Sequence, residues 1–302
     1  MPFFFGTLLG LAAASGVSIA YLCSRLFYEK VEKNSFLLLV VSQMQMGGLA
    51  VLILPFVWSP FPLTVVTLFP LFGTIFFGMG GQFILFLTLQ RATPSQVAPL
   101  LALKIFILAF ASMIFLQKEI SSLQWIGIAL CFAATFLSNF TGDSISLKGF
   151  FGILTTCSGY ALGDVFATVL IRELSSAGVK SPVLLGTCLI YSTAGVMGLA
   201  LGLPQRRKLT TVTPWKFAFY FSILYFLSDM CLFSAFKLVG PIFGNIVQST
   251  RGIISVFLAK LISLRGLALS YLEPEISRSV AVQRVLAASL FTLAIALYVF
   301  GE

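Results

Sequence analysis

Residues 240–260 read GPIFGNIVQSTRGIISVFLAK, an apolar stretch of membrane-spanning length with Arg251 near its middle. Arg251 lies ten residues after Pro241, which at about 1.5 Å rise per residue is roughly 15 Å along a helix. The hydrocarbon core of a bilayer is about 30 Å thick, so this spacing predicts a charge near the midplane. A charge at that depth costs about 2.5 kcal/mol or more unless it faces a cavity or a partner.

An earlier stretch, PSQVAPLLALKIFILAF (94–110), has the same arrangement. Its cation, Lys104, also lies ten residues after a proline, Pro94. Two cations at one depth in two similar helices predict that Lys104 and Arg251 belong to one functional site.

The composition predicts an integral membrane protein. Of 302 residues, 59% are hydrophobic and 10% are charged, whereas soluble domains carry about a quarter charged residues. The net charge of +9 is spread over short loops, as in membrane proteins whose basic loops set their orientation. We therefore expect the lipid bilayer as a partner and no nucleic acid.

Several classes of chemistry are excluded by the residues that are missing. The sequence has no histidine, and its five cysteines form no CxxC pair, so histidine triads and the common zinc sites are excluded. No GxxxxGK phosphate loop occurs, which excludes an ATP-driven pump within this chain alone. We expect no enzyme, no metal and no cofactor.

Apolar runs of about twenty residues recur ten times along the chain. The expected spans are 3–23, 35–58, 67–90, 95–116, 122–140, 150–172, 183–203, 217–237, 241–263 and 284–301. Spans of this length leave only loops between them. The longest loops would be 24–34, 204–216 and 264–283, so no soluble domain is expected.

Related residues recur at a fixed spacing in the two halves of the chain. A shift of 147 positions superposes Leu85-Phe86 on Leu232-Phe233, Lys104 on Arg251 and Gln82 on Asp229. Near the start of each half, a shift of 143 superposes Ser15-Gly16 on Ser158-Gly159 and Tyr21 on Asp164. Because five spans per half reverse the second half in the membrane, the predicted fold is an all-α membrane protein. Its ten transmembrane helices form two inverted five-helix repeats, 1–141 and 149–302, around a central cavity.

Residues 93–138, TPSQVAPLLALKIFILAFASMIFLQKEISSLQWIGIALCFAATFLS, resemble a known family. They are similar to the fourth and fifth helices of EamA-type, ten-helix members of the drug/metabolite transporter superfamily, including a glutamate, Glu119, in the joining loop. The resemblance extends over nearly the whole chain, although about nine extra residues precede Glu275, the expected counterpart of Glu119. It implies a central cavity lined by helices 1, 3, 4, 6, 8 and 9, with helices 5 and 10 at the periphery.

The candidate substrate-binding residues are the ionic side chains inside the expected spans and the polar residues near them. They are Lys104, Arg251, Asp164, Asp229, Gln82, Gln248, Tyr160, Tyr225, Tyr21 and Asn245. Intramembrane ionisable residues mark solute or proton sites by default. Two cations and two anions suit a zwitterion, since Lys or Arg binds a carboxylate and Asp binds an ammonium.

The preferred hypothesis is a secondary transporter that moves a small polar metabolite by alternating access. The solute would be of amino-acid or S-adenosylmethionine type, both of which the resemblance includes, and a coupling proton on an aspartate or a counter-substrate would be a further partner. One alternative is an exchanger of a phosphorylated or nucleotide-type anion bound by Lys104 and Arg251. The others are a channel or non-transport membrane scaffold, and a bundle in which Asp164 and Asp229 simply pair with the two cations as salt bridges.

Basic residues divide unevenly between the two sides of the expected bundle. Twelve Lys and Arg fall in loops on the side of residues 24–34, and four fall on the side of the termini: Lys118, Arg172, Lys180 and Lys237. By the positive-inside rule both termini would then lie outside, whereas bacterial members of the resembling family more often keep them inside. The expected location is a multi-pass position in a bacterial inner (plasma) membrane.

Overall fold

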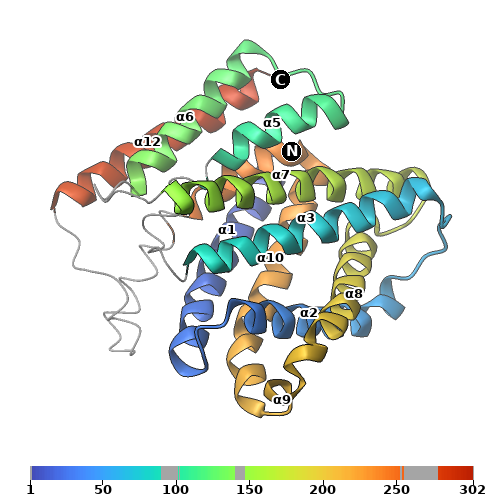
Figure 1. The fold of residues 1–302 in the computed structure, drawn as a ribbon. Helices are drawn as coiled ribbons and strands as arrows, with labels where there is room; N and C mark the ends of the chain where they lie inside the picture. The colour runs from blue at the N-terminus through green and yellow to red at the C-terminus, as the bar shows by residue number, and fades with distance from the viewer. Residues whose placement is uncertain are drawn as a thin grey trace.

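The computed structural model describes residues 2–89, 101, 103–139, 147–251, 254 and 278–301. All regular elements within these residues are helices, which pack side by side as Figure 1 shows. Pro94, Glu275 and residues 264–277 lie outside the described residues, so the expectations for them stay predictions.

The helices follow the apolar runs of the sequence. In the first half they are α1 (Pro2–Lys30), α2 (Ser35–Val57), α3 (Val65–Leu89), α5 (Leu103–Phe115) and α6 (Ser122–Asn139). In the second half they are α7 (Leu147–Ser176), α8 (Pro182–Gly202), η1 (Leu203–Gln205), α9 (Arg206–Leu209), α10 (Val212–Gln248) and α12 (Arg278–Phe300).

Six helical segments within the described residues are long and apolar enough to cross a membrane. They are Pro2–Lys30, Ser35–Val57, Val65–Thr88, Leu147–Ser176, Pro182–Leu209 and Val212–Gln248. Three shorter apolar helices accompany them: Leu103–Phe115, Ser122–Leu137 and Leu286–Phe300. The chain is therefore an all-helical, multi-pass membrane protein.

Two predicted loops are wrong in part because helices continue into them. Residues 24–34 were expected as a loop, but α1 runs to Lys30. Phe27 explains the extension, since its ring is fully buried in a cluster with Leu37 and Phe221. In the other predicted loop, 204–216, α10 already begins at Val212 and the Trp215 indole donates to the carbonyl of Leu209 at 2.8 Å.

The predicted spans 217–237 and 241–263 are joined in the structure. Helix α10 continues to Gln248 and is broken at Gly240, whose φ is 80° and ψ 162°. Glycine tolerates this conformation because it has no Cβ, and the following residue, Pro241, has no N–H to continue the helix. A turn at Ser249–Thr250 then precedes Arg251, so the predicted uninterrupted helix through this point is wrong.

Four long helix pairs form most of the packing. They are α1 with α10, α3 with α7, α2 with α8, and α6 with α12; Figure 1 shows the last pair side by side at the top of the view. The α2–α8 crossing is the tightest kind, since a Cβ on Gly47 would lie 2.6 Å from the Cα of Gly195, and one on Gly195 would lie 2.7 Å from the Cα of Gly47. Small residues let membrane helices approach this closely.

We predict that Gly47→Ala destabilises the protein by about 1–3 kcal/mol, because the new methyl group has no room beside backbone that cannot move away. Gly48→Ala is the matched control on the same helix, since a Cβ at Gly48 meets no atom within 4 Å. Thermal unfolding in detergent measures both variants. Equal melting temperatures for the two would contradict the close α2–α8 crossing.

Candidate functional site

A polar cavity of about 80 Å³ lies among α1, α2, α3, α5, α7, α8 and α10. Nine of the ten candidate residues line it: Lys104, Arg251, Asp164, Asp229, Gln82, Gln248, Tyr160, Tyr225 and Tyr21. The tenth, Asn245, is buried directly behind the cavity wall, against Asp164. The structure thus brings together residues that span more than 200 positions of sequence.

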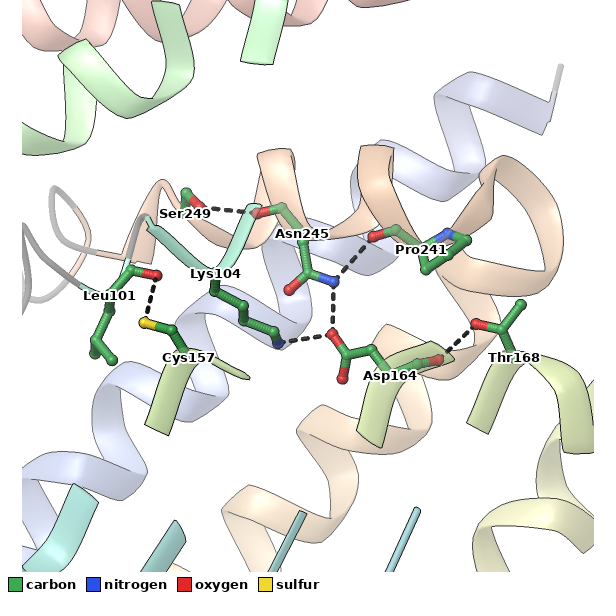
Figure 2. A network of polar contacts seen from close by, with 8 residues as sticks. All are labelled: Leu101, Lys104, Cys157, Asp164, Thr168, Pro241, Asn245 and Ser249. Atoms are coloured by element: carbon green, nitrogen blue, oxygen red, sulfur yellow. Dashed lines mark hydrogen bonds and ion pairs between the residues drawn. The ribbon is translucent and has the colours of Figure 1, made fainter. Parts of the chain in front are cut away.

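Lys104 forms an ion pair with Asp164. Its Nζ lies 2.7 Å from Asp164 Oδ2, and both side chains are about nine-tenths buried (Figure 2). The same ammonium lies 5.5 Å from the centroid of the Tyr160 ring, one turn before Asp164 on α7. Because a buried charge pair is stable only when its remaining groups are satisfied, the surroundings of Asp164 decide what this pair can do.

Asn245 supplies the second contact to the same carboxylate oxygen. Its Nδ2 donates to Asp164 Oδ2 at 2.7 Å and to the carbonyl of Pro241 at 2.9 Å (Figure 2). The Pro241 carbonyl and the Asn245 side chain both belong to the helical segment after the Gly240 break. The break in α10 therefore positions the amide that orients Asp164.

Arg251 is held differently from Lys104. Its carbonyl accepts a hydrogen bond of 3.1 Å from Ser18 Oγ on α1, and its guanidinium lies 6.0 Å from the centroid of the Tyr21 ring. No carboxylate among the described residues forms an ion pair with it. A cation over an aromatic face is stabilised by about 0.5–2 kcal/mol, which leaves the five guanidinium N–H donors able to bind an anion.

Asp229 has a neutral partner. The hydroxyl of Tyr191 on α8 donates a short hydrogen bond to Asp229 Oδ2. Within the part of the chain that the structure describes, Asp229 has no cationic partner. The hypothesis that both aspartates pair with the two cations therefore holds for Asp164 and fails for Asp229.

Two glutamine side chains form a third polar pair on the cavity wall. Gln43 Nε2 on α2 donates to Gln82 Oε1 on α3 at 2.8 Å. Among the described residues the other atom of each amide, Gln43 Oε1 and Gln82 Nε2, has no hydrogen-bond partner although both are buried. Buried polar atoms without partners are rare and need an explanation, and one acceptor and one donor beside the cavity are available to a bound solute.

The contacts follow the spacings found in the sequence. Lys104 and Arg251 are 147 residues apart, Asp164 and Tyr21 are 143 apart, and the contact of Lys104 with Asp164 matches that of Arg251 with Tyr21. The Gln43–Gln82 pair corresponds in the same way to Tyr191–Asp229, at spacings of 148 and 147. Each polar pair in one half of the site has a counterpart of different chemistry in the other half.

Sequence reasoning missed Gln43 and Tyr191. Both lie on helices, α2 and α8, that the family resemblance did not assign to the cavity, yet both line it. A single Gln or Tyr inside an apolar span carries no local signal of its role. The available signal was their spacing of 148, which matches the spacing of their partners Gln82 and Asp229.

Comparisons with known proteins agree with this architecture. No curated protein matches the sequence. A solved structure, described as "Crystal structure of protein", is similar over 97% of this chain and 95% of its own, with a TM-score of 0.63 and 16% identity, which shows a shared fold alone. The model of the EamA-like transporter family matches residues 4–140. By that match the chain is a member of the EamA-like transporter family, within the drug/metabolite transporter superfamily.

Proposed function

We propose that this protein is a secondary transporter that moves a small zwitterionic solute of amino-acid type by alternating access. One observation carries the proposal: a cation and an anion, Arg251 and Asp229, line the same buried cavity, and each is held by a tyrosine instead of by the other. A solute carboxylate can bind the Arg251 guanidinium through two parallel hydrogen bonds. Its ammonium can bind Asp229, where Tyr191 holds the carboxylate in place.

The alternative, exchange of a phosphorylated or nucleotide-type anion, has less support. It requires both Lys104 and Arg251 for the anion, but the Lys104 ammonium lies 2.7 Å from Asp164. Asp229 on the same wall would repel a doubly charged phosphate. The remaining positive charge, that of Arg251, fits a single carboxylate better.

The size of the cavity favours a small solute in this conformation. Its 80 Å³ has room for roughly five to eight water molecules, at about 10–15 Å³ each. A small amino acid fits within that space, whereas a solute of S-adenosylmethionine type requires the helices to move apart. Access itself requires such movement, as alternating access does in transporters generally.

An inverted two-fold arrangement of residues 1–141 and 149–302, in ten helices, is the second part of the proposal. The helix pairs support it, because α1 packs on α10 as α7 packs on α3, while α2 packs on α8 and α6 on α12. This is the pattern expected when a two-fold axis relates the first three helices of each half. Under that relation, Lys104–Asp164 and Arg251–Tyr21 would exchange environments when the transporter reverses its accessible side.

Other classes of function have less support. No described group of His, Cys, Asp or Glu could hold a metal ion, and transporters of this family are generally not enzymes. A channel would need no solute-sized site with matched charges, and saturable counterflow separates a carrier from it. We place the protein in a bacterial inner membrane, with Asp229 as the candidate for a coupling proton if transport is proton-driven.

We predict that Lys104→Gln and Asp164→Asn each destabilise the protein by about 3–5 kcal/mol, because each leaves one buried charge without its partner. The double variant removes both charges and should regain most of that loss. Thermal unfolding of the two single variants and the double variant gives the coupling between the sites. Additive losses in the double variant would contradict the pairing.

We predict that Asp229→Asn lowers transport at least tenfold with little change in melting temperature, because Asn keeps the Tyr191 contact but removes the charge that binds the ammonium. Proteoliposome uptake of radiolabelled amino acids measures the loss. Glu119→Gln is the matched control, since it removes an exposed carboxylate far from the cavity wall.

The double variant Asp229→Asn/Arg251→Gln separates a solute site from an internal pair. If Asp229 and Arg251 each bind part of the solute, the double variant stays inactive. Recovery of uptake in it would show that the two charges only neutralise each other and would overturn the assignment.

A further inference from the structure

A second and larger cavity lies at the end of the bundle away from the first site's polar wall. It has a volume of about 610 Å³ and is formed by the α5–α6 loop, the last two turns of α7 and the break in α10. Three cationic residues line it, one from each of these elements: Lys118, Arg172 and Lys237. No acidic side chain is among its lining residues.

The backbone around this cavity is held in unusual conformations. Gln117 on its wall has a φ of 51°, and it is the one non-glycine residue with positive φ in the described part of the chain. Such backbone persists only where the surroundings fix it, and it clusters at ligand sites. The Gly240 break forms the facing wall, 3.8 Å from the Lys118 ammonium as measured from a Cβ placed on Gly240.

The positive charge of the cavity is fixed in position. The Lys118 ammonium lies 5.6 Å from the centroid of the Tyr298 ring on α12, which ties it to the bundle. The neighbouring acids along the chain, Glu119 and Glu173, are not among the residues that line the cavity. Three cations around one cavity repel each other unless an anion lies between them.

Lipid-facing apolar residues lie next to the basic ones along the chain. Ile114 is 73% and Phe115 50% exposed just before the α5–α6 loop, and Leu238 is 43% exposed beside Lys237. A ligand in this cavity would therefore have charged contacts on one side and apolar surface for hydrocarbon chains beside them. Basic pockets between membrane helices bind phosphorylated lipid headgroups in this way.

The geometry points to a phosphate-binding site in this cavity, occupied by the headgroup of an anionic membrane lipid. The volume is within the range of about 300–1,000 Å³ of small-molecule sites. The Arg172 guanidinium can bind two phosphate oxygens at once, and Lys118 and Lys237 add point charges. The site is separate from the transport cavity and does not depend on the identity of the transported solute.

Native mass spectrometry of the purified full chain in detergent tests this site. We expect phosphatidylglycerol to remain bound to the wild type, with phosphatidylcholine retained at least tenfold less. The double variant Arg172→Gln/Lys237→Gln should lose most of the bound phosphatidylglycerol. Lys180→Gln is the matched control, because Lys180 is an exposed cation just beyond α7 that does not line the cavity, and it should retain the lipid.

The other arms give the remaining outcomes. The charge-conserving variant Arg172→Lys/Lys237→Arg should still bind the lipid, which separates lost charge from misfolding. If inorganic phosphate displaces phosphatidylglycerol at millimolar concentration, the phosphate site is supported, but its source is soluble phosphate and the lipid assignment is overturned. Equal retention of both lipids, or unchanged retention in the double glutamine variant, would overturn the site itself.

Discussion

The structure depends on how it neutralises charge inside a membrane. The Lys104 ammonium lies 2.7 Å from Asp164, and Asn245 donates to the same carboxylate oxygen at 2.7 Å. These residues come from α5, α7 and the segment of α10 after the Gly240 break, so the pair ties both halves of the chain together at one point. Without it, a buried charge would remain in a medium where charges are costly. The kink at Gly240 follows from this constraint, because it positions Asn245.

The opposite half of the site meets the same constraint with neutral groups. Arg251 lies over the Tyr21 ring, and Asp229 accepts a hydrogen bond from Tyr191. Tyrosine stabilises each charge only in part, so both can still bind a ligand. The difference between the halves explains why one cavity can contain a closed ion pair and two available charges. It also gives the transporter a polar direction within an otherwise repeated framework.

Much of this site was predictable from the sequence because the bilayer restricts where charges can lie. The spacings from Pro94 to Lys104 and from Pro241 to Arg251, with the shift that relates them, were enough to group most of the cavity residues. The partners of each charge were not predictable. Lys104 contacts Asp164 whereas Arg251 contacts Tyr21, and this depends on packing of α5 on α7 and of α1 on α10. Likewise, Phe27 extends α1 through a buried ring contact with distant residues that no local pattern reveals.

The central claim is that Arg251 and Asp229 hold the two ends of a zwitterion. Isothermal titration calorimetry with a small amino acid that binds, its N-acetyl derivative and its methyl ester tests this most directly. The N-acetyl derivative lacks the ammonium and the ester lacks the carboxylate, so the account predicts that the free amino acid binds at least tenfold more tightly than either. It also predicts that Asp229→Asn lowers affinity for the free amino acid but not for the N-acetyl derivative. Equal affinity for all three compounds would contradict the account.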